Sequence, residues 1–174
     1  NGVLASKKKN NNHTPLNLPM AELDDLNLID DAKAGCTVGI MYMKGKKLYV
    51  ANTGDLEVLL SRNNGEHVLL SQKHHPTYRD EFERIRAAGG YVTGDGALDG
   101  DLTVSRGFGF FNYLPHTHAG PDITEIELTS LDDIIIIGTG VLWEHISYQL
   151  ASDISRQEKG DPMIAAQKLR DFAI

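Results

Sequence analysis

The chain of 174 residues lacks the features that define several classes of protein. A single cysteine, Cys36, excludes an internal disulfide framework and fits a reducing cytosol. No run approaches the ~20 consecutive apolar residues of a membrane-spanning helix, and no signal peptide is recognisable. The formal net charge of −7 argues against a nucleic-acid partner, because phosphate binding needs a basic face. We therefore expect a cytoplasmic domain with neither a membrane span nor a nucleic-acid partner.

The remaining composition is that of a globular domain. Apolar residues make up 41% of the chain and charged residues 24%, which is enough for a sizeable core. Residues 1–34 differ, because Lys7-Lys8-Lys9 runs into Asn10-Asn11-Asn12, and we predict a flexible linker there with a short helix over 20–29. The chain begins at Asn1 rather than at Met, so we expect a fragment of a longer protein, with residues 35–174 as its folded domain.

Period-two alternation of apolar residues predicts an antiparallel meander in the first half of the domain. Cys36, Ile40 and Tyr42 share one phase of this alternation, and Cys36 is expected to be a buried strand thiol rather than a nucleophile. Asn63-Asn64-Gly65 favours a hairpin, because Asn and Gly tolerate positive φ. The predicted strands cover residues 36–42, 48–51, 56–60, 67–70, 91–93, 123–128 and 134–137.

Three helices are also predicted within residues 35–174. Thr77 is the expected N-cap of the first, which Gly89-Gly90 ends. The second covers 144–156, and the third begins at Asp161-Pro162, an N-cap acid followed by proline. Strands outnumber helices and the two kinds of element are segregated along the chain, which predicts an α+β sandwich rather than a doubly wound fold.

The end of the predicted buried strand at 134–137 is the most informative part of the sequence. Gly138-Thr139-Gly140 follows it, and a strand that ends at a small polar residue and a glycine is suited to hold a metal ion. A hard divalent cation needs a carboxylate at such a position, whereas Thr139 supplies only a neutral hydroxyl. The sequence therefore indicates a degenerate metal-ligand position at Thr139 and Gly140.

Several short motifs together resemble the metal-dependent PP2C (PPM) family of Ser/Thr phosphatases. They are Gly35-Cys36-Thr37, Val50 to Asp55, His74 with Pro76, Glu83-Arg84-Ile85 with Gly89-Gly90, Leu102 to Arg106 with Gly109, Pro121-Asp122 and Gly138-Thr139-Gly140. Their combination is specific and covers about residues 35 to 174. The fold implied is a PP2C-like sandwich of antiparallel sheets flanked by helices, incomplete at the N-terminus.

Longer stretches are similar to the PP2C-like domain of fungal adenylate cyclases. These stretches cover residues 74–90, 142–147 and 160–170. The parent protein that this resemblance implies is a lyase that makes cAMP from ATP in Ras–cAMP signalling. A domain of such a protein is expected in the cytoplasm, or at the periphery of the membrane through its parent.

The chain departs from the metal site that the family resemblance implies. Active members bind two Mg²⁺ or Mn²⁺ ions through aspartates, and a metal-bound water attacks the phosphoryl group. One such aspartate is replaced at Thr139-Gly140, an early Asp-Gly-His-Gly motif is absent, and a Gly-Asp of the family is Gly109-Phe110. Asp55 remains either as a vestigial metal ligand or as a turn residue that caps backbone N–H groups. Arg106 is expected to form a buried ion pair.

Three functions are consistent with these residues. The first is a catalytically inactive PP2C-like regulatory or docking domain of a fungal adenylate cyclase, without a cofactor. The second is an active Mg²⁺- or Mn²⁺-dependent Ser/Thr phosphatase domain. The third is a stand-alone interaction module that presents Phe108, Phe110 and Phe111 to a partner. The expected partners are other proteins or other domains of the parent chain, and unpaired strand edges would allow a homodimer.

Overall fold

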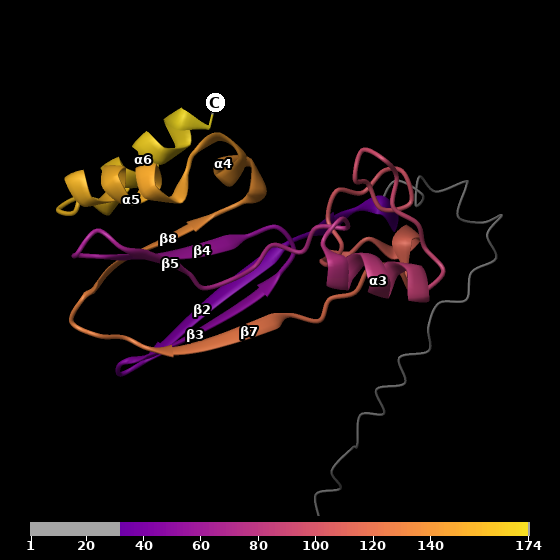
Figure 1. The fold of residues 1–174 in the computed structure, drawn as a ribbon, viewed down its shortest axis with the longest axis horizontal. Helices are drawn as coiled ribbons and strands as arrows, with labels where there is room; N and C mark the ends of the chain where they lie inside the picture. Colours follow the sequence, from indigo (N-terminus) through magenta and orange to yellow (C-terminus); the bar gives the residue numbers. More distant parts are fainter. Residues whose placement is uncertain (1–31, 174) are drawn as a thin grey trace, which may run out of the picture. The chain divides into compact units, whose positions relative to one another are not determined.

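The computed structural model of the chain describes residues 32–173 (Figure 1). The linker predicted over 1–34 lies outside the described residues except for its last three, and the helix predicted over 20–29 lies wholly outside them. The strands are β1 (Gly35–Cys36), β2 (Val38–Lys44), β3 (Lys47–Thr53), β4 (Glu57–Arg62), β5 (His67–Leu69), β6 (Phe108–Gly109), β7 (Asp122–Glu127) and β8 (Asp132–Gly138). The helices are α3 (Arg79–Ala87), the short 3₁₀ helix η2 (Phe111–Tyr113), α4 (Gly140–His145), α5 (Tyr148–Gln157) and α6 (Pro162–Phe172). None of these helices is long and apolar enough to cross a membrane.

The longer strands form two antiparallel sheets with the strand orders β2-β3-β7 and β5-β4-β8. β3 is the centre of the first sheet, where Val50 lies opposite Thr124 of β7. β4 is the centre of the second sheet, where Leu59 lies opposite Ile136 of β8. The two-residue strands β1 and β6 pair with each other. The predicted α+β class and its antiparallel sheets are thus confirmed.

Strand β4 directs its side chains alternately into two cores. Val58 and Leu60 are buried with Leu48 and Val50 of β3, between the two sheets. Leu59 points to the opposite face, where it is buried with apolar residues of β8, α5 and α6. Figure 1 shows α4, α5 and α6 together on that face of β5-β4-β8. The sandwich therefore has three layers, in which the sheet β5-β4-β8 lies between the helices and the sheet β2-β3-β7.

The outer face of β2-β3-β7 departs from the sequence prediction. Ile40 and Tyr42 are each 59% exposed, and Cys36 is exposed rather than buried. Alternation determines which residues share a face of a strand, but it does not determine whether that face is covered. The prediction of a buried Cys36 thiol is wrong, because β1 ends before Thr37 and Cys36 pairs with Phe108 of β6 instead of joining the sandwich.

Two helix boundaries also differ from the prediction. Tyr78 rather than Thr77 is the N-cap of α3, and the Thr77 hydroxyl is instead hydrogen-bonded to His75 Nδ1 at 2.7 Å. The helix predicted over 144–156 is two helices, α4 and α5. They are separated by Ile146, which is extended and buried in the core, and Ser147 then caps α5.

Replacing Leu59 with Ala should lower the free energy of unfolding by about 2–5 kcal/mol, because the side chain is fully buried and its loss leaves a cavity. Leu131→Ala, at a position that is 44% exposed, is the control and should change this free energy by less than about 0.5 kcal/mol. Urea unfolding followed by circular dichroism measures both variants. Equal losses in the two variants would contradict the packing described for β4.

Candidate functional site

Asp55 and Gly140, both singled out by the sequence, lie together at one end of the sheet β5-β4-β8. The Gly140 N–H donates to Asp55 Oδ2 at 3.3 Å across 85 positions of sequence. The pairing of Glu57 with Gly138 brings them together, since Asp55 precedes β4 and Gly140 follows β8. A Cβ atom at residue 140 would lie 2.8 Å from Asp55 Oδ2, so a larger side chain would displace the carboxylate.

Thr139 takes no part in this contact. It is the exposed N-cap residue of α4, and its side chain makes no capping hydrogen bond. Asp55 instead accepts an N–H of the first turn of α4, which is the role that the capping interpretation predicts. Within residues 32–173, no group of three or more His, Cys, Asp or Glu side chains is placed to hold a metal ion.

A second carboxyl group, Glu57, lies near Asp55. Glu57 is 4% exposed and accepts a hydrogen bond from the Tyr148 hydroxyl of α5 at 3.0 Å. Burial raises the pKa of Glu57 and the charge of Asp55 adds to the rise, although the Tyr148 hydrogen bond opposes it. Burial and the hydrogen bond to Glu57 raise the pKa of Tyr148 to about 12. The sequence analysis missed this pair, because 91 positions separate its members and no local pattern relates them.

His74 joins the turn that carries Asp55 to the segment that carries α3. Its ring is buried, and Nδ1 accepts the Gly54 N–H at 2.9 Å, while the His74 backbone N–H donates to the Gly54 carbonyl at 2.8 Å. Because Nδ1 is an acceptor, the ring proton is on Nε2, which donates to Asp122 Oδ2 at 3.0 Å. His74 therefore forms hydrogen bonds with both the N–H and the carbonyl group of Gly54.

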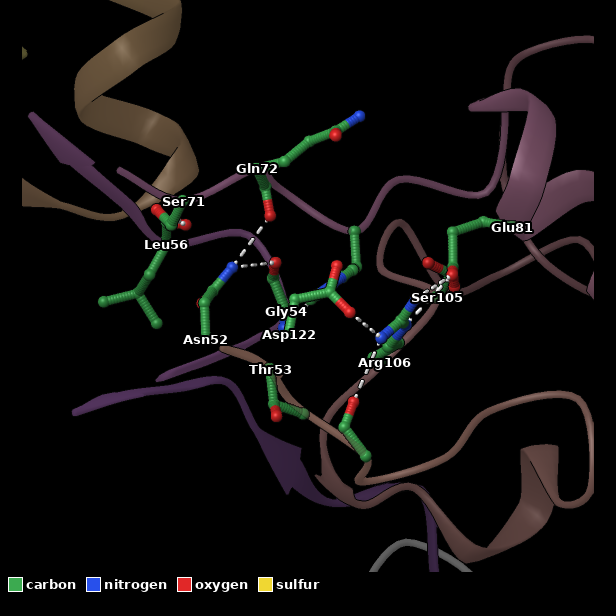
Figure 2. Close-up of polar contacts among 12 residues, drawn as sticks. Asn52, Thr53, Gly54, Leu56, Ser71, Gln72, Glu81, Ser105, Arg106 and Asp122 are labelled. Carbon is green, nitrogen blue, oxygen red and sulfur yellow. Dashed lines mark hydrogen bonds and ion pairs between the residues drawn. The ribbon is translucent and has the colours of Figure 1, made fainter. Parts of the chain in front are cut away.

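Asp122, whose side chain is 57% exposed, leads on to a group of charges around the mostly buried Arg106, which Figure 2 shows between Asp122 and Glu81. Arg106 lies 2.8 Å from Asp122 Oδ1 and 2.6 Å from Glu81 Oε1, and it also donates to the Gly120 carbonyl at 3.2 Å. The second oxygen of Glu81 accepts from Arg84 at 2.9 Å. The buried ion pair predicted for Arg106 is confirmed, and this arginine has little capacity left for an external phosphate.

The charges of this group depend on one another. Burial would raise the pKa of Glu81, but hydrogen bonds from Arg106 and Arg84 outweigh burial and lower the pKa to about 2. Burial would likewise raise the pKa of Asp122, but hydrogen bonds from His74 and Arg106 outweigh burial and lower this pKa. Both carboxylates are therefore ionised near neutral pH and hold Arg106 in place.

A cavity of about 400 Å³ lies beside this charge group. Its charged lining residues are Lys73, Arg79, Asp80, Glu81, Arg106 and Asp122. Three cations and three carboxylates balance, so the cavity does not favour an anion over a cation. A larger cavity of about 690 Å³ lies along β8 and α6, and it is lined mainly by apolar side chains.

The aromatic loop expected to form an interaction surface exposes two of its three rings. Phe108 and Phe111 are 48% and 67% exposed, whereas Phe110 is buried beside Val104 and Tyr113. The backbone of Phe110 is left-handed, with a φ of 53°, and its ring points into the protein. The expected cluster of three exposed rings is therefore a pair, and Phe110 belongs to a small core of its own.

Comparison with known sequences relates the chain to two groups of proteins. The sequence model of the family Protein phosphatase 2C matches residues 5–174. The chain is 49% and 47% identical, over 144 residues and 83% of its length, to adenylate cyclases of Lachancea kluyveri and Mycosarcoma maydis. It is 38% identical over 154 residues to the probable protein phosphatase 2C 11 of Arabidopsis thaliana. The chain spans only 8% and 6% of the two cyclases and 41% of the plant protein.

Solved structures show the same fold. Serine-threonine phosphatase 2C from Toxoplasma gondii superposes with a TM-score of 0.72 and 19% identity, over 90% of this chain and 65% of that one. Another Toxoplasma gondii phosphatase gives a TM-score of 0.66 with 26% identity, over 73% of this chain and 43% of that one. The resemblance to the PP2C-like domain of fungal adenylate cyclases is thus confirmed.

The lowered pKa of Glu81 predicts how stability depends on pH. Folding lowers this pKa from 4.5 to about 2, so the ionised group stabilises the fold above pH 4.5, and this stabilisation is lost as the pH falls through about 2. Glu81→Gln removes the titration. Between pH 5 and pH 2 the wild type should therefore lose about 2–3 kcal/mol more unfolding free energy than the variant.

Glu83→Gln is the matched control, because Glu83 lies on the same helix but its side chain is 62% exposed. Its loss of stability with falling pH should follow that of the wild type. Urea unfolding at a series of pH values compares the three proteins, and parallel curves for the wild type and Glu81→Gln would refute the role given to Glu81.

Proposed function

The chain belongs to the protein phosphatase 2C family, and we propose that it is a regulatory or docking domain of a fungal adenylate cyclase rather than a phosphatase. The observation that carries the proposal is the contact between Asp55 and Gly140. This chain has Thr139 at the place where the family resemblance puts a metal-binding aspartate. The backbone N–H of the neighbouring Gly140 donates a hydrogen bond to one carboxylate oxygen of Asp55.

The residues present do not fit a pair of divalent cations. Two such ions need several carboxylates to offset their mutual repulsion and their loss of hydration. Asp55 is the one carboxylate in contact with the Thr139-Gly140 turn among the described residues, and Glu57 is turned into the core toward Tyr148. The raised pKa of Glu57 also makes it a poorer source of negative charge. We therefore derive no phosphoryl-transfer step for this domain.

A domain without such chemistry would act through binding. The adenylate cyclases that match are more than ten times longer than the matched segment, so other domains of the parent chain are natural partners. Conversion of ATP to cAMP would then belong to another part of the parent, and the charge group around Arg106 would serve stability.

The second candidate is a Mg²⁺- or Mn²⁺-dependent Ser/Thr phosphatase. The observation in its favour is that Asp55 and Glu57, two carboxyl groups, lie close together at the end of the sheet where the family resemblance places metal. Thr139→Asp distinguishes the candidates. Residue 139 is exposed and aspartate is a good N-cap, so the substitution should not impair folding.

Calorimetric titration of Mn²⁺ into the wild type should give no binding heat, and phosphopeptide turnover should stay at the background rate. Thr139→Asp should gain Mn²⁺ binding, because it restores a carboxylate beside Asp55. Thr139→Asp combined with Asp55→Asn is the control and should lose that gain, since asparagine keeps the cap acceptor but not the charge. Mn²⁺ binding with turnover by the wild type would overturn the proposal in favour of the phosphatase.

A further inference from the structure

Helix α5 lies on the sheet β5-β4-β8, and its two flanks differ in chemistry (Figure 1). Ala151 and Ile154 belong to one flank and are buried in the apolar core that α6 shares. Tyr148, Ser152 and Arg156 succeed one another at intervals of four residues, a spacing that places them on one face of a helix. These three residues form the second flank, which is polar.

The polar flank runs along β5 and the turn that joins it to β4. The ring of Tyr148 lies 6.1 Å from the ring of His67, the first residue of β5. A Cβ atom at Gly65, in the turn, would lie 3.7 Å from Nη1 of Arg156. Ser152 is midway between Tyr148 and Arg156 on the helix and is fully buried, so its hydroxyl group lies between these two contacts.

The sheet presents two polar side chains to this flank. Ser61 of β4 lies directly opposite His67 in the strand register, so their side chains are on one face of the sheet. Residues two apart in a strand also share a face, and Leu59, two residues before Ser61, is buried with Ala151 of α5. Ser61 and His67 therefore lie on the face that α5 covers.

Four buried atoms in this region have no hydrogen-bond partner within residues 32–173. They are Oγ of Ser61, Nδ1 of His67, Oγ of Ser152 and Nε of Arg156, and we call these four residues the polar seam. Ser61 and Ser152 are both 0% exposed, so bulk solvent does not reach their hydroxyl groups. Buried polar atoms are costly unless they are paired, which indicates that a bound molecule pairs with them.

We propose that the polar seam binds one ordered water molecule, which joins α5 to β4 and β5. Water donates two hydrogen bonds and accepts two. Nε of Arg156 can only donate, a serine hydroxyl can donate or accept, and a neutral imidazole nitrogen can accept. The water therefore accepts from Arg156 and from one serine, and it donates to His67 and to the other serine. Buried waters in proteins typically make about three such bonds to groups that are otherwise unpaired.

The water supports the position of α5 on the sheet. Tyr148 begins this helix, and its hydroxyl group holds Glu57 at the end of the sheet. A joint made by water is enthalpically close to a direct hydrogen bond, so it fixes the polar flank without side-chain contacts between α5 and β4. The inference goes beyond the proposed function and does not rest on it, because Asp55 and Gly140 are not part of the polar seam.

A double-mutant cycle of Ser61→Ala and Ser152→Ala in the 174-residue chain tests the shared water. Each single variant should raise the equilibrium constant of unfolding, measured in urea, by about 3- to 10-fold, because the water loses a partner and the other atoms of the seam lose the water. The double variant should unfold no more readily than the less stable single variant, since one change already releases the water. A crystal structure of the wild type should show a water molecule within hydrogen-bond distance of all four atoms.

Thr117→Val is the matched control. Thr117 is 1% exposed and its hydroxyl group also lacks a partner among the described residues, but it lies in the loop that follows η2. Its effect should multiply with that of Ser152→Ala, because the two hydroxyl groups share no water. Single serine variants that unfold less readily than the wild type would show dry hydroxyl groups and overturn the proposal. Independent effects of Ser61→Ala and Ser152→Ala, or an ion in the polar seam of the crystal structure, would also overturn it.

Discussion

The packing of the domain depends on the absence of a side chain at residue 54. Gly54 has a φ of 119°, and a Cβ atom there would lie 2.2 Å from the Thr37 methyl group and 3.2 Å from the Arg106 carbonyl oxygen. Three segments that are remote in sequence therefore meet at one point, and His74 closes this junction with hydrogen bonds to both sides of Gly54. The junction holds the turn before β4, which carries Asp55, and it anchors the segment that leads to α3. The contacts at Gly54 consequently hold both the sheets and the charge group around Arg106 in place.

Negative charge is distributed unevenly around this junction. On the side of α3, two ionised carboxylates contact Arg106, and hydrogen bonds from Arg106, Arg84 and His74 lower their pKa values. On the side of β8, Asp55 accepts a hydrogen bond from the backbone N–H of Gly140, and burial raises the pKa of Glu57. The end of the sheet where the family resemblance places a metal thus offers little of the negative charge that two divalent cations require. This contrast is the physical basis for the binding role that we propose for the domain.

Helices and strands could be predicted from the sequence, because local patterns determine them. Contacts between residues that are distant in the sequence could not be predicted. The apolar run at 134–137 and the Asp161-Pro162 start of α6 appear where the sequence places them. Family motifs also located Asp55 and Gly140, although no local pattern could show that they touch. The exposure of Ile40 and Tyr42 was not predictable, because alternation leaves open which face is covered. The pairing of Glu57 with Tyr148 escaped prediction for a related reason, since tertiary packing alone brings β4 and α5 together.

The pairing of β4 with β8 has a consequence for the order in which the chain folds. Glu57 lies opposite Gly138, so some eighty residues must be synthesised before the central strand of this sheet gains its second neighbour. The hairpins β2-β3 and β4-β5 close over short turns and can form much earlier. During translation, the face of β4 that carries Leu59 therefore stays exposed to solvent until β8 and the helices that follow it have left the ribosome. Nascent chains of this domain should be most dependent on chaperones in that interval, between the completion of β5 and the arrival of α6.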